Sequence, residues 1–244
     1  MTESNYAACF DLSLAQECPF PKDWGNARNF SDTPGDSGGA TMCGVTQREY
    51  DVWRKSQGEP TQDVRKITRG EALLLEHQSY WLPHCGLLPN GLDLQHFDTS
   101  LNEGPHAALL VLQDALNVQA DGVWGPLTAS AVTQANIVAL VQRYTLARHA
   151  AYARIVSSHP GDAKFEKDWF RRCTQIGNSA LLMAQSASSG VVGTTVKPLT
   201  GAPQRPVLMG GQAMAAAPAA SDAPTPLGPL AELKAKLKEL LDLL

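Results

Sequence analysis

Apolar positions recur at helical spacing along most of the chain up to about residue 182, and this pattern predicts a mainly α-helical domain. Phe10 and Leu14 would share one face of a first helix that ends near Glu17. A stretch rich in Gly, Pro and Asp, residues 21–41, follows this helix and predicts a long loop.

Two threonines mark the expected starts of the next two helices. Thr46 is followed three positions later by Glu49, and Thr68 by Glu71, which is the spacing of a capping box. The helical pattern then continues over four further stretches, at 92–102, 105–117, 127–156 and 165–185.

The composition changes after residue 183. Residues 184–228 are rich in Ala, Gly, Pro, Ser and Thr without periodicity, which predicts a disordered, flexible linker after a domain at 5–183. The last segment, 229–244, places its leucines on one stripe and predicts a short amphipathic helix. Because so short a helix is marginal alone in water, we expect it to support self-association, docking to a partner protein or binding to a membrane surface.

Charge and hydropathy exclude two classes of protein. The formal net charge is −4 and no stretch is dense in Lys and Arg, so nucleic acid is not an expected partner. No run approaches the roughly 18 apolar residues that a transmembrane helix needs, so no transmembrane segment is expected. The first 20 residues lack a basic start followed by an apolar core, which predicts no secretory signal peptide.

The cysteines and histidines do not form a metal-binding pattern. The cysteine count is five, with irregular spacing and no CxxC, and the histidines show no HExxH spacing, so no metal site is expected. We favour free thiols in a reducing compartment, with a Cys18–Cys43 disulfide beside the loop as the alternative.

Glu17 is the first candidate for catalysis. It stands where a helix ends and a Gly-rich loop begins, and that loop carries Asp36 and then Thr41. Glycoside hydrolysis needs one carboxylic acid to protonate the leaving oxygen and a second polar group on the opposite face of the sugar, and it needs no cofactor. Spacing alone also fits a solvated surface glutamate, a turn Asp and a Thr that caps local backbone.

The motif DSGGATMCGVT, residues 36–46, resembles the D-P-G-G-x-T-x-x-G-I-T signature of glycoside hydrolase family 108. This family comprises N-acetylmuramidases, often labelled secretion-activating proteins, and includes phage endolysins. The resemblance implies a lysozyme-like fold, with Glu17 as the catalytic acid and with Asp36 and Thr41 as the matching Asp and Thr of the signature.

Further motifs extend the resemblance over roughly residues 8 to 175. Tyr80-Trp81 is similar to the Y-W that ends a family helix, and residues 88–113 resemble the L-P-x-G-L…F-D-x-A-V-N-x-G…L-Q block. ADGVWGPLTASAV and FEKDWFRR resemble motifs of the family's predicted peptidoglycan domain, expected at about 105–175. Several motifs in the right order are more specific than one.

The sequence also departs from the family pattern. The family's E-G-G-Y is Glu17-Cys18-Pro19-Phe20, a family Gly is Asp168, and the loop after Glu17 is longer than usual. The longer loop leaves Asp23 and Asp32 open as alternatives to Asp36 for the second carboxylate.

Four more residues are candidates for substrate binding. Asp98 and Asn102 would lie on one helix face and contact sugar hydroxyl or N-acetyl groups, or they would form a buried polar pair. Tyr80 and Trp81 would contact sugar rings, although aromatic residues at helical spacing are more often part of a core.

The resemblance implies a peptidoglycan hydrolase that cleaves the β-1,4 bond between N-acetylmuramic acid and N-acetylglucosamine. Its expected partners are peptidoglycan glycan strands, which it would reach at the cell wall or periplasm by an unidentified export or release route. A catalytically inactive peptidoglycan-binding module, a lytic transglycosylase, and an interaction protein organised by the terminal helix remain alternatives.

Overall fold

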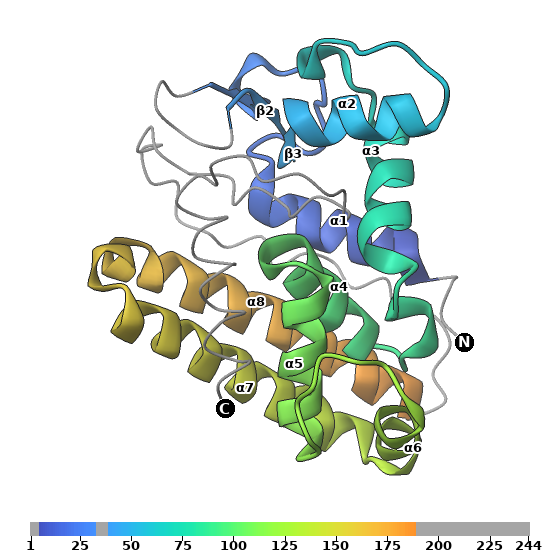
Figure 1. The fold of residues 1–244 in the computed structure, drawn as a ribbon, viewed down its shortest axis with the longest axis vertical. Coiled ribbons are helices and arrows are strands. Elements are labelled where there is room, and N and C mark those ends of the chain that lie inside the picture. The colour runs from blue at the N-terminus through green and yellow to red at the C-terminus, as the bar shows by residue number, and fades with distance from the viewer. Residues whose placement is uncertain (1–4, 33–38, 189–244) are drawn as a thin grey trace.

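The computed structural model describes residues 5–32 and 39–188, and within them it confirms the mainly α-helical fold. In Figure 1 a small sheet with α2 and α3 forms the upper part, α1 crosses the middle, and α4 to α8 form the lower part. The elements of the upper and middle parts are α1 (Tyr6–Glu17), β1 (Phe30–Ser31), β2 (Thr41–Met42), β3 (Val45–Thr46), α2 (Gln47–Ser56) and α3 (Arg69–Glu76).

The sheet is antiparallel in the order β1-β2-β3 and pairs Ser31 with Thr41 and Thr41 with Thr46. Both predicted capping boxes are confirmed: the Thr46 hydroxyl accepts from the Glu49 amide at 3.2 Å, and the Thr68 hydroxyl accepts from the Glu71 amide at 3.1 Å. The sheet therefore passes directly into α2, and Glu49 is fixed at the start of that helix.

The lower part consists of long helices packed side by side, with α7 along α8 and α4 against α5 (Figure 1). Their bounds are α4 (Leu92–Glu103), α5 (Pro105–Leu116), α6 (Pro126–Gln134), α7 (Ile137–Ser158) and α8 (Ala163–Ser188). The single run predicted at 127–156 is thus two helices. The Asn136 side chain caps α7 by accepting from the Ala139 amide at 3.0 Å, so the chain breaks there although the apolar pattern continues.

The helical domain extends beyond the predicted boundary at 183, because α8 ends at Ser188 and Ala184 is buried. Gly91, at the start of α4, lies so close to α8 that a Cβ there would be 2.2 Å from the Ala180 carbonyl oxygen. The domain therefore continues about one helical turn past residue 183, because α8 runs on to Ser188. The predicted amphipathic helix at 229–244 and most of the predicted linker lie outside the described residues.

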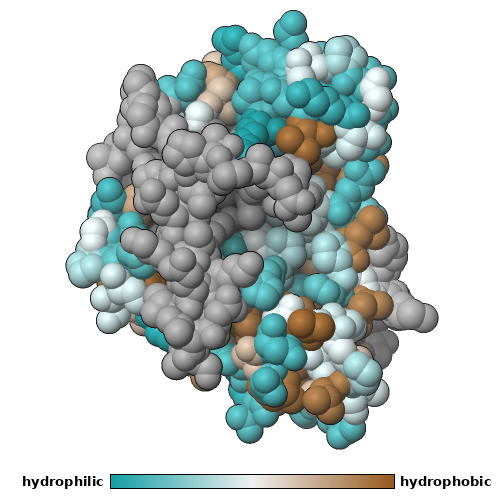
Figure 2. Space-filling model, viewed as in Figure 1, coloured by the Kyte–Doolittle hydropathy of each residue, from teal (hydrophilic) through white to brown (hydrophobic). Residues whose placement is uncertain are grey.

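On the face shown in Figure 2, the described residues are mostly hydrophilic, with separate hydrophobic patches among them. Among the described residues, no helix is both long enough and apolar enough to cross a membrane.

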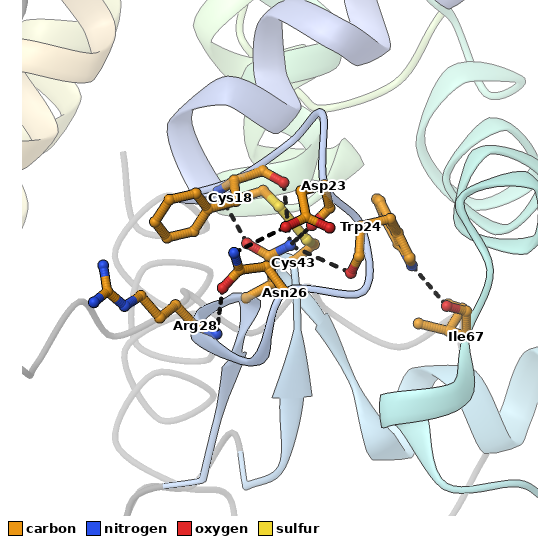
Figure 3. The surroundings of a disulfide bond; sticks show 9 residues. Cys18, Asp23, Trp24, Asn26, Arg28, Cys43 and Ile67 are labelled. Carbon is orange, nitrogen blue, oxygen red and sulfur yellow. Dashed lines mark hydrogen bonds between the residues drawn. A yellow bond between two sulfur atoms is a disulfide. The ribbon is translucent and has the colours of Figure 1, made fainter.

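A disulfide joins Cys18 to Cys43, which corrects the expectation of free thiols for these two residues (Figure 3). Cys9, Cys85 and Cys173 are free and buried. The number of cysteines in the sequence could not reveal this pairing. The disulfide forms because the fold brings the end of α1 against the turn between β2 and β3.

After α1, several hydrogen bonds of the described residues gather on one buried amide side chain, that of Asn29. Asn29 Nδ2 donates to the carbonyls of Phe20 at 3.2 Å and Asp23 at 2.9 Å, and Asn29 Oδ1 accepts from the Phe20 amide at 2.9 Å. The Trp24 indole donates to the Ile67 carbonyl at 2.7 Å. These bonds and the disulfide fix the end of α1 relative to the sheet.

Candidate active site

A pocket lies where α1, the β2–β3 turn and the α2 and α3 segments meet, and three carboxyl side chains line it. Glu17 comes from the last position of α1, Glu49 from the first turn of α2, and Glu76 from the last position of α3. Apolar and small residues complete most of the lining: Leu14, Val45, Leu75, Leu101, Ser13, Cys43 and Gly44. The pocket is therefore acidic at three points and apolar between them.

Two features of the neighbouring backbone place Glu17 in this pocket: the Cys18–Cys43 disulfide and the glycine at position 44. Cys18 is bonded to Cys43, and Gly44 follows Cys43 in the sequence. Gly44 has a φ of 89°, and a Cβ there would lie 3.2 Å from Glu17 Cβ and 3.3 Å from Glu17 Cγ. Glycine is thus required at this position for its conformation and for the room it leaves to the glutamate.

Gly44→Ala tests this placement, with Gly58→Ala as the matched control. Both glycines have positive φ, but Gly58 has no atom within 4 Å of the added Cβ. Each variant should lose about 1 kcal/mol of unfolding free energy from backbone strain, measured by chemical denaturation. Only Gly44→Ala should also lose activity that depends on Glu17, by about tenfold or more, because it displaces Glu17. Equal activity in the two variants would contradict the placement.

The Glu17 side chain is 19% exposed and forms an ion pair with Arg172 on α8, 155 positions away in the sequence. Arg172 also binds Asp98, through Nη2 to Oδ1 at 2.9 Å and through Nε to Oδ2 at 3.0 Å. Burial lowers the pKa of the Arg172 guanidinium to about 9, which leaves it positively charged at neutral pH. At neutral pH a cation therefore lies beside the Glu17 carboxyl.

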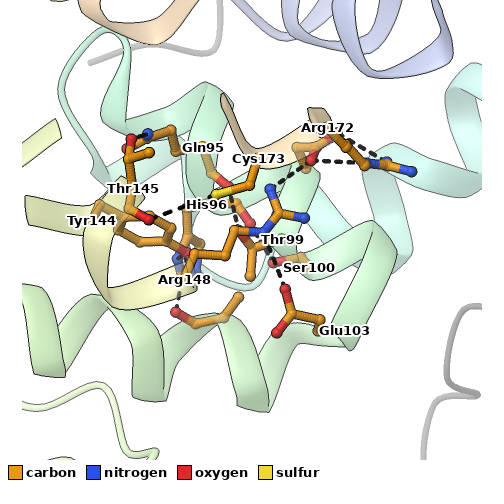
Figure 4. Close-up of polar contacts among 12 residues, drawn as sticks. Gln95, His96, Thr99, Ser100, Glu103, Tyr144, Thr145, Arg148, Arg172 and Cys173 are labelled. Atoms are coloured by element: carbon orange, nitrogen blue, oxygen red, sulfur yellow. Dashed lines mark hydrogen bonds and ion pairs between the residues drawn. The ribbon is translucent and has the colours of Figure 1, made fainter. Parts of the chain in front are cut away.

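A second arginine completes this buried network. Arg148 on α7 binds Asp98 Oδ2 at 2.7 Å and Glu103 Oε1 at 3.1 Å. It also donates a hydrogen bond to the Tyr152 hydroxyl at 2.9 Å. Figure 4 shows Arg148 and Arg172 reaching from neighbouring helices towards α4. Charges removed from water need partners of this kind, so the network ties α1, α4, α7 and α8 together behind the pocket.

Glu49 is held by three hydrogen bonds. Its Oε2 accepts from the Thr46 amide at 3.0 Å and from the Thr46 hydroxyl at 2.8 Å, and its Oε1 accepts from the Tyr80 hydroxyl at 2.5 Å. Three donors favour the ionised carboxylate. Burial and the nearby Glu49 carboxylate raise the pKa of Tyr80 well above its usual range, so Tyr80 remains a donor.

Glu76 differs from the other two carboxyls because, within the described ranges, no hydrogen bond or ion pair joins it to another residue. It is 7% exposed and lines the pocket. Burial raises the pKa of Glu76 well above its usual range, and the Glu49 and Asp98 carboxylates raise it further. These effects favour the uncharged carboxylic acid form of Glu76.

The structure brings only some of the predicted catalytic groups together. Asp36 lies outside the described residues, and Thr41 is buried in β2, where its hydroxyl donates to the Gly39 carbonyl at 3.0 Å. Asp23 and Asp32 are exposed in the loop after α1, and Asp23 accepts from the Asn26 side chain at 3.0 Å.

The predicted substrate-binding residues divide between pocket and core. Tyr80 lines the pocket. Trp81 is wholly buried, with its ring centroid 5.1 Å from that of Tyr6 and 5.6 Å from that of Phe97, so it belongs to the core. Asp98 is also wholly buried between the two arginines, and Asn102 is buried, so neither residue presents its side chain to solvent.

Three residues of the site were not predicted from the sequence. Arg172 is the last residue of FEKDWFRR, so the motif contained it, but nothing local links it to Glu17. Glu49 was assigned to a capping box, and it serves both as the cap and as a pocket residue. Glu76 ends an apolar helix segment and carries no motif. No group of three or more metal-ligating side chains occurs in the described ranges.

Comparisons with known proteins divide the chain into two matched regions. The family model described as glycosyl hydrolase 108 matches residues 25–104, and the model of a predicted peptidoglycan domain matches residues 107–174. Glu49, Glu76 and Asp98 fall in the first region and Arg148 and Arg172 in the second, whereas Glu17 precedes both. The network behind the pocket therefore combines both regions.

No curated protein matches the chain. Among solved structures, the "Structure of Brucella abortus SagA" matches with a TM-score of 0.62 and 24% sequence identity. The match covers 76% of this chain and 99% of that chain, and at this identity it shows a shared fold.

Proposed function

Since the chain belongs to glycosyl hydrolase family 108 and carries a predicted peptidoglycan domain, it is a peptidoglycan hydrolase, and we propose that it is a muramidase with Glu17 as its general acid. The bond cleaved would be the β-1,4 bond between N-acetylmuramic acid and N-acetylglucosamine. The observation that carries the proposal is the position of Glu17, half-buried in a pocket lined largely by apolar side chains.

In the proposed reaction the Glu17 carboxyl gives its proton to the glycosidic oxygen while the bond from that oxygen to the sugar C1 carbon breaks. Water then adds to C1 and returns a proton. The positive charge of Arg172 stabilises the carboxylate that remains on Glu17, and Arg172 is itself held by Asp98. The apolar lining, which includes Leu14 and Val45, reduces the access of bulk water.

Asp36 remains our proposal for the group on the opposite face of the sugar, with Asp23 and Asp32 as alternatives. The hydrogen bond from Thr41 to the Gly39 carbonyl supports a role for Thr41 in fixing this loop. The proposed place of action is the cell wall or periplasm, and the Cys18–Cys43 disulfide supports an oxidising compartment.

Digestion of purified sacculi followed by mass spectrometry of the products tests this function. The expected products have reducing N-acetylmuramic acid ends, which form when water attacks C1. Anhydro ends would show a lytic transglycosylase, and sacculus binding without any product would show an inactive binding module. Either result would contradict the proposal.

A further inference from the structure

The proposed reaction leaves one pocket residue unused, and that residue is Glu76. Arg172 pairs with Glu17, and Glu49 accepts three hydrogen bonds. The Glu76 carboxyl has no such partner in the described part of the chain, although it is more than nine-tenths buried and lines the same pocket. Within the described residues, the Glu76 carboxyl is therefore available to contact a ligand bound in this pocket.

The groups around Glu76 favour its uncharged form. Glu49 on α2 and Asp98 on α4 contribute negative charge, and Glu17 on α1 lines the same pocket. The nearby Tyr6 and Tyr80 are neutral, because burial raises the pKa of each far above its usual range and Glu76 adds to that rise. Arg172, which pairs with Glu17, is committed to Glu17 and Asp98. The Glu76 carboxyl therefore has an O–H to donate as well as a carbonyl oxygen to accept.

We infer that Glu76 is a substrate-contacting residue whose carboxyl donates a hydrogen bond to an acceptor oxygen of the glycan bound in this pocket. The inference rests on the proposed function, because that function makes the glycan the ligand. N-acetylated sugars offer hydroxyl, ring and amide carbonyl oxygens, and any of these can accept the bond. A site built around a buried donor discriminates strongly against ligands that leave the donor unpaired.

Two substitutions at Glu76 separate this role from others. Glu76→Gln keeps a donor and an acceptor in nearly the same shape as the uncharged acid. Glu76→Leu keeps the approximate size and suits the neighbouring Leu14, Val45, Leu75 and Leu101, but it has no donor. Thermal unfolding of both variants shows whether either one has lost the fold.

The probe is the disaccharide N-acetylglucosaminyl-N-acetylmuramic acid, which lacks the bond that the proposed reaction cleaves. Its dissociation constant, measured by calorimetry near pH 6, should change less than about threefold in Glu76→Gln and should rise about tenfold or more in Glu76→Leu. As the pH is raised through the elevated pKa of Glu76, the wild type should bind more weakly, because the ionised carboxylate has no proton to donate. Glu76→Gln should not show this loss.

The inference is overturned if the wild type does not bind the disaccharide, if Glu76→Leu binds it as tightly as the wild type, or if Glu76→Gln is as weak as Glu76→Leu. A pH dependence that persists unchanged in Glu76→Gln overturns it as well. None of these results depends on turnover. Sacculus cleavage by the wild type, measured in parallel, tests the proposed function separately from the role of Glu76.

Discussion

Glu17→Gln should digest sacculi at least about 100-fold more slowly than the wild type while keeping the fold. Glutamine preserves the size of the side chain and can still contact Arg172 through its amide oxygen, but it has no carboxyl proton for the leaving oxygen. The rate is measured as the release of soluble muropeptides, and circular dichroism monitors the fold.

Glu59→Gln provides a matched control for this experiment. Glu59 also faces an arginine, Arg54, at 3.6 Å, but its side chain is 61% exposed. This variant should digest sacculi at the wild-type rate. If Glu17→Gln retains a near-wild-type rate, Glu17 is not the general acid and the proposed mechanism fails.

Asp98→Asn should lower the free energy of unfolding by about 3–5 kcal/mol, because it leaves Arg148 and Arg172 buried without their shared carboxylate. It should also reduce activity, since Arg172 would no longer be held behind Glu17. Urea denaturation measures the first effect and sacculus digestion the second.

Asp114→Asn makes the same chemical change at an Asp–Arg pair on the surface. Asp114 lies 3.1 Å from Arg154, and their side chains are 41% and 52% exposed. An exposed pair of this kind contributes about 0–1 kcal/mol, so this variant should resemble the wild type. If Asp98→Asn were no less stable than Asp114→Asn, the buried network would not hold the helices together.

Local sequence signals predicted the fold well where they were decisive. The Thr46–Glu49 and Thr68–Glu71 boxes begin α2 and α3 as expected, and the first helix ends at Glu17. The break at Asn136 was missed because the apolar pattern on both sides reads as one helix, and only the capping side chain separates α6 from α7. The spacing of apolar residues indicates which positions are buried, but it does not indicate where a capping side chain ends one helix and begins the next.

The candidate site was harder to predict because its contacts are long-range. Glu17 stood out as a carboxyl at a helix–loop junction, but its partner Arg172 lies on the last described helix. Asp98 and Trp81 were proposed to contact sugars, and their burial depends on how α4 packs, which no local pattern reveals. Glu76 follows three leucines, so it resembled the polar end of an apolar helix.

The ion pairs behind Glu17 also bear on how this chain can be recombined with its relatives. The boundary between the two matched regions, near residues 105–106, separates two sequence models, yet Asp98 on one side and Arg148 and Arg172 on the other share one set of charges. A chimera joined at that boundary would take Asp98 from one parent and the residues at positions 148 and 172 from the other. Such an exchange preserves the site only when the donor region supplies arginines that reach the same carboxylates, so we expect the two regions to function as one unit.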